Sequence, residues 1–215
     1  VQQLEQLGRV LLKFYQAANT IYRWSAEGRL PAWPSAWLDR GKPQSVIDLQ
    51  RERAFRAELP RVIRPDILLT DDGLRITELD SVPGGIGLTA WLNETYSEHA
   101  EVLGGARGMV DGFAGIFTGD GSVHVMVSEE SATYRPEMEW LAEQIGSHFS
   151  VRDTDYIGIK EGDSLYRFFE LFDLENIESA HQIFELACPG PLPYTHLPAH
   201  ETQADLVSRL LLDKN

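Results

Sequence analysis

The sequence predicts an α/β protein in which helices cover the faces of a sheet and a helical segment comes first. Strand-like and helix-like hydrophobic periods alternate after residue 62, and the residues before it carry a helical period. We therefore expect an N-terminal helical segment over residues 1–60, packed on the sheet, and an α/β domain over residues 61–215. The chain has 215 residues, of which 43% are apolar, and this is enough for a sizeable core.

The first 60 residues predict two helices joined by a loop. Apolar residues recur at steps of three and four between residues 2 and 25, which indicates an amphipathic helix. Ser45 is a suitable N-cap for a second helix over residues 45–58. Prolines in the segment 28–37 predict an irregular loop between them.

The middle of the chain predicts a β-hairpin and one further strand. Two strand-like runs, 62–70 and 74–80, are separated by a tight turn, and a third run covers residues 122–128. We expect these three strands to belong to one sheet, flanked by helices over residues 88–104 and 135–146.

The last third of the chain continues the alternation. Short strands are expected over residues 150–159 and from residue 162, and helices over residues 175–187 and 201–213. Four prolines make the segment 188–200 an irregular loop.

Charge and composition exclude several classes of partner. The formal net charge of −14 repels phosphate backbones, so we expect no nucleic-acid partner. No apolar run approaches the roughly 20 residues that span a bilayer, and the first residues lack the apolar block of a signal peptide. The single cysteine, Cys188, suits a reducing compartment. We therefore expect no membrane partner and a cytoplasmic location.

The stretch "TELDSVPGGIG" (77–87) is the strongest candidate for a ligand site. Ligands of open α/β sheets bind beyond the carboxyl ends of strands, and this stretch leaves a strand and enters a helix. Its acids lie on one face of the strand and suit an ammonium group, while the glycine-rich turn offers N–H groups to a carboxylate or phosphate. Alternatively, the glycines only serve the turn and the acids are solvated. The candidate binding residues here are Glu78, Asp80, Ser81, Gly84 and Gly85.

A second candidate, "VSEESATYRPE" (127–137), also follows a strand and precedes a helix. Ser128 and Arg135 would face the same crevice as the first stretch if the two strands are neighbours, with Arg135 pairing with a ligand carboxylate. In the alternative interpretation, Ser131 or Thr133 simply caps the following helix.

Other polar residues give weaker signals. Arg64 precedes Asp66 by two positions and could reach a ligand or form a structural ion pair. His196 and His200 have the spacing of metal ligands, but the proline between them prevents a shared helical face, so we expect no metal site. No nucleophile–base pair supports an independent hydrolase.

The stretch "RPDILLTDDGLRITELDSVPGGIGLTAW" (64–91) contains an Arg-x-Asp strand, a hairpin and an acidic, Pro- and Gly-containing turn. In this order it resembles the N-terminal part of ATP-grasp carboxylate–amine ligases of the glutathionylspermidine-synthase-like kind. Segments 134–146 and 150–157 look like the helix and next strand of that family's pre-ATP-grasp domain, and 166–176 is similar to a segment before its catalytic domain. The matching residues of the first stretch are Arg64, Asp66, Glu78, Asp80, Pro83 and Gly84.

The resemblance implies a Rossmann-like pre-ATP-grasp sheet and a substrate-binding role in a ligase that forms C–N bonds. In this family ATP and Mg²⁺ bind to a later ATP-grasp domain, which would begin where this chain ends. We therefore expect no cofactor in this chain, no activity of the chain alone, and a separate or missing ATP-grasp domain as partner. The expected ligand is a small molecule with an amine, a carboxylate or both. The alternative is a non-catalytic α/β module that binds a small molecule or acts as a scaffold.

Overall fold

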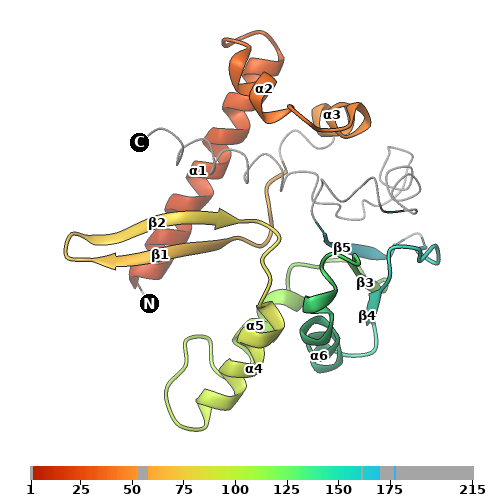
Figure 1. The fold of residues 1–215 in the computed structure, drawn as a ribbon. Coiled ribbons are helices and arrows are strands. Elements are labelled where there is room, and N and C mark those ends of the chain that lie inside the picture. The colour runs from red at the N-terminus through yellow and green to blue at the C-terminus, as the bar shows by residue number, and fades with distance from the viewer. Residues whose placement is uncertain (1, 53–57, 161, 170–176, 178–215) are drawn as a thin grey trace. The chain divides into compact units, whose positions relative to one another are not determined.

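The computed structural model describes residues 2–52, 58–160, 162–169 and 177 (Figure 1). These residues form two compact units, one ending at Ser81 and one beginning at Val82. Our predictions for 175–187 (except residue 177), 188–200 and 201–213, including those for Cys188, His196 and His200, lie outside the described residues. The elements are α1 (Gln2–Ala26), α2 (Trp33–Leu38), α3 (Gln44–Arg51), β1 (Arg64–Thr70), β2 (Gly73–Asp80), α4 (Ile86–Ser97), α5 (Gly108–Ala114), β3 (Val123–Val127), η1 (Ala132–Tyr134), α6 (Arg135–Ile145), β4 (Phe149–Arg152) and β5 (Ser164–Phe168).

The first unit is built around α1, which confirms the predicted N-terminal helix. The apolar stripe of α1 packs against the hairpin, where Leu11 and Tyr15 form a buried cluster with Leu79 of β2. Burial of one stripe on a strand face is what stabilises so long an amphipathic helix. Partly buried apolar residues surround this cluster: Leu7, Phe14, Leu59 and Ile63.

The predicted loop over residues 28–37 contains the start of a short helix, α2. Pro34 lies in its first turn, where proline's fixed φ angle suits a helix and its missing N–H costs nothing. The buried Ser25 hydroxyl holds this turn against α1, because it accepts a hydrogen bond from the Ser35 N–H (3.1 Å) and donates to the Pro31 carbonyl (2.7 Å). The proline therefore starts a helix here rather than preventing one.

The predicted hairpin is confirmed, and it contains a β-bulge. Pairing steps from Asp66↔Glu78 to Ile67↔Ile76, so that the register passes over Thr77. Paired residues share a face, and side chains of the uninterrupted β1 alternate. The bulge thus places Ile76 on the same apolar face as Leu79, whereas regular alternation would have placed it with Glu78.

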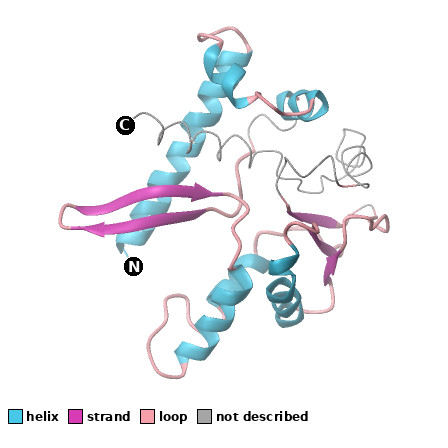
Figure 2. Cartoon of the chain, in the orientation of Figure 1, coloured by secondary structure: helices cyan, strands magenta, loops and turns pink. Residues whose placement is uncertain are grey.

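The expectation that the hairpin and the 122–128 strand share one sheet is wrong. The described strands form two sheets: an antiparallel pair β1–β2 in the first unit, and a parallel sheet of order β4-β3-β5 in the second. The hairpin buries its apolar face at Leu79 against α1 and has no need of a third strand there. The coarser prediction, a mixed α/β protein, holds: helices and strands occur in both units (Figure 2).

The second unit is a small parallel sheet with helices packed on it. All five residues of β3 and all five of β5 are buried, as expected for a parallel sheet covered on both faces. On one face Phe113 of α5 meets Tyr166 with ring centroids 5.0 Å apart and Phe149 at 6.3 Å. These aromatic contacts attach α5 to the sheet.

Element boundaries in the second unit differ from the prediction where glycine is frequent. The helix expected to reach residue 104 ends at Ser97, and α5 was not predicted at all. Gly108 and Gly112 give the α5 segment little helical propensity, so that tertiary packing forms this helix. The strand expected over residues 150–159 is confined to β4. None of the helices within the described residues has an apolar stretch long enough to cross a membrane.

Asp163 joins the starts of β3 and β5. Its carboxylate accepts hydrogen bonds from the Ser122 N–H (3.0 Å) and the Lys160 N–H (2.9 Å), and its Oδ2 lies 3.1 Å from His124 Nε2. Burial opposes ionisation, but the hydrogen bonds from Lys160, His124 and Ser122 outweigh it and hold the pKa of Asp163 below its ordinary value.

This lowered pKa predicts a loss of stability in acid. Because the pKa of Asp163 is lower in the folded than in the unfolded chain, its contribution is present above the ordinary carboxyl pKa and is lost as pH falls through the folded value. We expect the free energy of unfolding to fall between about pH 5 and pH 3, and Asp163→Asn to make this slope shallower. Denaturant unfolding at a series of pH values measures both slopes, and equal slopes would contradict the prediction.

Candidate functional site

The base of the hairpin carries a cluster of four charged residues on one face, which we call the charged face. Arg64 is paired across the strands with Asp80, and Asp66 with Glu78. Arg64 Nε lies 3.0 Å from Asp66 Oδ1, and Arg64 Nη2 lies 3.3 Å from Asp80 Oδ2. The alternation of the strand therefore brings Glu78 and Asp80 to one face, as the sequence predicts, and adds Asp66 to them.

The electrostatics of the charged face favour cations. Burial disfavours the charge on Arg64, but the hydrogen bond to Asp66 and the fields of Asp80, Asp66 and Glu78 raise its pKa. Glu78 is exposed and makes no hydrogen bond or ion pair with the described residues. The charged face itself holds three carboxylates and one guanidinium, and its exposed Glu78 suits an incoming ammonium group.

Ser81 lies in the core of the first unit and not on the charged face. It is 1% exposed, and its Oγ lies 3.2 Å from the Tyr15 hydroxyl, so the two form a buried hydrogen bond between α1 and the end of β2. Binding of a ligand by Ser81 would require this contact to open. A role for Ser81 in binding therefore stays a prediction.

The glycine-rich turn after the hairpin already holds an anionic group of the protein itself. Glu137, from the first turn of α6, accepts hydrogen bonds from the Gly85 N–H (2.7 Å, to Oε1) and the Leu88 N–H (2.8 Å, to Oε2). These are N–H groups at the start of α4 that have no partner within the helix. We expected a ligand carboxylate at this position, and the structure supplies an internal one.

Close packing explains the glycines of this turn. A Cβ atom on Gly87 would lie 2.1 Å from the Glu137 carbonyl oxygen, and one on Gly84 would lie 2.4 Å from Tyr134 Cε1. Gly85 has a φ of 82°, which L-residues rarely adopt. The sequence predicts that the N–H groups of this turn bind an anionic group, but nothing near the turn in the chain indicates that Glu137 supplies one.

Ser128 and Arg135 of the second unit have protein partners. The buried Ser128 Oγ accepts a hydrogen bond from the Ser131 N–H (3.3 Å). Arg135 forms an ion pair with Asp153 and lies 3.6 Å from Glu139. Glu78, Asp80 and Ser81 belong to the first unit, so the prediction of a single crevice shared with Ser128 and Arg135 remains a prediction.

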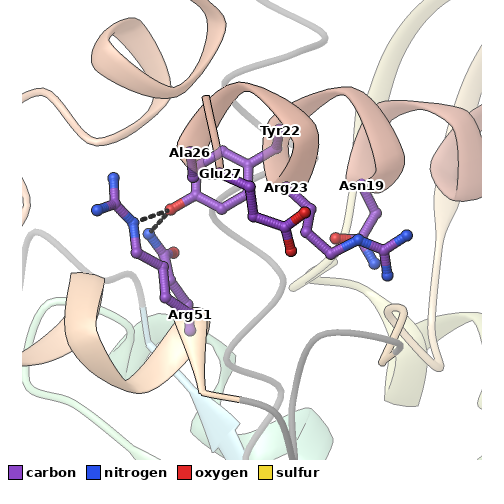
Figure 3. Close-up of a pocket in the computed structure, with 7 residues that line it drawn as sticks. Asn19, Tyr22, Arg23, Ala26, Glu27 and Arg51 are labelled. Atoms are coloured by element: carbon purple, nitrogen blue, oxygen red, sulfur yellow. Dashed lines mark hydrogen bonds between the residues drawn. The ribbon is translucent and has the colours of Figure 1, made fainter. Parts of the chain in front are cut away.

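The first unit also contains a pocket of about 140 Å³ between α1 and α3 (Figure 3). The Tyr22 hydroxyl donates to Asp39 Oδ1 (2.8 Å) and accepts from Gln50 Nε2 (2.6 Å) and Arg51 Nε (3.3 Å). Burial, opposed by Arg51 and assisted by Asp39, raises the pKa of Tyr22 to about 12. The residues that line the pocket are Asn19, Tyr22, Arg23, Ala26, Glu27, Gln50 and Arg51.

This hydrogen-bonded group braces α3 on α1. The Tyr22 oxygen already makes three hydrogen bonds, which is its full capacity, so it has none left for a ligand. None of the binding residues predicted from the sequence, all of which lie in the described part of the chain, lines the pocket. The charged face brings together three of the eight predicted binding residues: Arg64, Glu78 and Asp80.

We compared the chain with known protein families, curated proteins and solved structures. No protein-family model, no curated protein and no solved structure matches the chain at a significant level.

Proposed function

We propose that this chain is the substrate-binding, pre-ATP-grasp region of an ATP-dependent carboxylate–amine ligase. The observation that carries the proposal is the convergence of Arg64, Asp66, Glu78 and Asp80 on one exposed face of the hairpin. These four residues are among the six in which the first stretch resembles that family. The Rossmann-like arrangement of the sheet and a cytoplasmic location belong to the same proposal.

The charged face supplies the chemistry that an amine substrate needs. A primary ammonium group has three donors and could be shared between the exposed carboxylate of Glu78 and that of Asp80. Arg64 holds Asp66 and Asp80 in place, and its positive charge would attract a carboxylate on the same ligand. A ligand with an amine and a carboxylate would then meet complementary charge at both ends.

The proposal assigns neither ATP nor Mg²⁺ to the described residues. Within them, no group of three His, Cys, Asp or Glu side chains is placed to hold a metal ion. In the proposed ligase, activation of the carboxylate as an acylphosphate belongs to an ATP-grasp domain, and the residues described in this chain bind and orient the substrate.

Replacing Asp80 by asparagine tests the proposal. Asparagine keeps the shape of Asp80 but removes the charge that would pair with an ammonium group, so we expect amine binding to weaken by about 1–3 kcal/mol. The measurement is calorimetric titration with amino acids, small peptides and polyamines, chosen first by a thermal-shift screen of the wild-type chain.

Asp72→Asn is the matched control. Asp72 lies in the turn of the same hairpin, its side chain is 86% exposed, and it is 3.7 Å from Arg75 rather than on the charged face. The control removes the same charge and should leave binding unchanged. If Asp80→Asn lowers the melting temperature by many degrees without ligand, Asp80 is a structural partner of Arg64 and the site assignment fails.

A non-catalytic binding or scaffold module is the second candidate. The ion pairs of Arg64 with Asp66 and Asp80 favour it, because they satisfy most of the charged face without any ligand. The native reading frame distinguishes the two candidates: ATP-grasp motifs beyond Asn215 would support the ligase, and a stop codon there would support the module.

A further inference from the structure

Arg152, at the end of β4, is held in an unusual way for a surface arginine. Its Nε lies 3.4 Å from His124 Nδ1 and donates a hydrogen bond to it. Its guanidinium carbon lies 4.4 Å from the centre of the Tyr156 ring, in a cation–π contact. The ring nitrogen of His124 and the face of the Tyr156 ring thus fix the orientation of the guanidinium. Neither of these groups carries a negative charge.

The acceptor that orients Arg152 is itself held in one tautomer. Arginine can only donate, so His124 Nδ1 must be unprotonated, and the ring proton must lie on Nε2. That proton points to Asp163 Oδ2, 3.1 Å away. The backbone N–H groups of Ser122 and Lys160 hold the Asp163 carboxylate. Asp163, His124 and Arg152 therefore form a chain that begins in the buried sheet and ends at a partly exposed guanidinium.

The terminal nitrogens of Arg152 make no hydrogen bond, and the residue has no carboxylate partner, within the described residues. Arg135, close by in the same unit, is by contrast paired with Asp153 and Glu139. Arg152 also lies at the carboxyl end of a parallel strand, where ligands of α/β sheets bind. An oriented fork of two N–H₂ groups at such a place matches the geometry of a planar oxyanion.

We propose that Arg152 is the anchor of an oxyanion site, which takes a carboxylate or a phosphate group, and that His124 is its positioning residue. This inference does not depend on the ligase proposal, because it uses only residues of the second unit. It also involves none of the binding residues predicted from the sequence.

The experiment is a titration of the ¹⁵N-labelled full chain with sodium succinate and, separately, with inorganic phosphate, followed by NMR. We expect the Arg152 Nε–H signal, assigned by its loss in Arg152→Lys, to move saturably with one or both anions. Movement with succinate alone identifies a carboxylate site, and movement with phosphate alone a phosphate site. If the signal does not move saturably at anion concentrations up to about 50 mM, the proposal is overturned.

Two variants distinguish the contribution of the forked shape of the Arg152 guanidinium from that of its positive charge. Arg152→Lys keeps the charge but loses the fork and should weaken binding about tenfold, whereas Arg107→Gln should not change it. Arg107 is a suitable control because it lies in the same unit and is 56% exposed, next to Asp111 on α5. Because Arg152→Lys has no Nε–H signal, its anion binding is followed by the chemical shifts of backbone amides near residue 152. Equal affinity of Arg152→Lys and the wild type would overturn the role of the fork.

Two substitutions of His124 test positioning. An asparagine oxygen can replace Nδ1 as acceptor for Arg152, whereas a glutamine amide reaches the place of Nε2 and leaves Arg152 without its acceptor. We expect His124→Asn to keep most of the affinity and His124→Gln to lose several-fold more. A purely structural role would make the two variants alike, and this outcome would remove His124 from the proposal. Amine binding at the charged face should be unchanged in both.

Discussion

Gly87→Ala is expected to destabilise the second unit by about 3 kcal/mol or more. The added Cβ would lie 2.1 Å from the Glu137 carbonyl oxygen and 2.6 Å from the carbonyl carbon. Both atoms belong to the backbone of α6, so no side-chain rotation can relieve the clash. The helices α4 and α6 would have to separate, which would also lengthen the hydrogen bonds to the Glu137 carboxylate. Denaturant unfolding followed by circular dichroism measures the change.

Gly112→Ala provides the control for this prediction. Gly112 is also a helical glycine of the second unit, it is exposed, and a Cβ there would meet no atom within 4 Å. Alanine favours a helix over glycine by about 0.5–1 kcal/mol, so this variant should be more stable than the wild type. If the two variants shift the unfolding midpoint in the same direction, the close packing of α4 on α6 is wrong.

Glu137→Ala should cost about 2–3 kcal/mol of unfolding free energy. Two hydrogen bonds from N–H groups to a charged acceptor are lost, and the favourable interaction of a carboxylate with the start of α4 is lost with them. Water can reach the exposed Leu88 N–H and replace part of the loss, but the Gly85 N–H is less accessible. Thermal and denaturant unfolding should both report the change.

Glu139→Ala separates this effect from a general loss of charge. Glu139 lies on the same helix two residues away, its side chain is 52% exposed, and it is 3.6 Å from Arg135. Exposed ion pairs contribute little, so this variant should change stability by less than about 0.5 kcal/mol. A similar cost for the two variants would mean that the contacts of Glu137 with α4 do not stabilise the unit.

The parts of the fold that the sequence predicts well are those with a strong local period. The hairpin, α1, α6 and β3 were all expected at nearly their observed bounds, because strand alternation and helical stripes are properties of neighbouring residues. The helix α5 has no such signal, since two of its seven residues are glycine. Its formation depends on contacts such as that of Phe113 with Tyr166, which no local pattern reveals.

Non-local pairing limited the prediction of the site in the same way. Alternation indicated that Glu78 and Asp80 share a face, and the cross-strand register then added Asp66 and Arg64 to it. The partner of the glycine turn lies 52 residues further along the chain at Glu137, where it reads as an ordinary acid of a first helical turn. Arg152 was likewise missed, because its orientation comes from His124, 28 residues away.

The bulge at Thr77 has a consequence for changes in chain length. One extra residue in β2 decides which side chains of the hairpin turn toward α1, since pairing steps from Glu78 to Ile76 there. Deletion of Thr77 would remove the bulge and leave every other pair of the hairpin in its present register, with Ile76 still on the face of Leu79. A one-residue insertion or deletion elsewhere between residues 66 and 78 would exchange the two faces of part of the hairpin, so it should be tolerated far less well than deletion of Thr77, even though much of this segment is exposed to solvent.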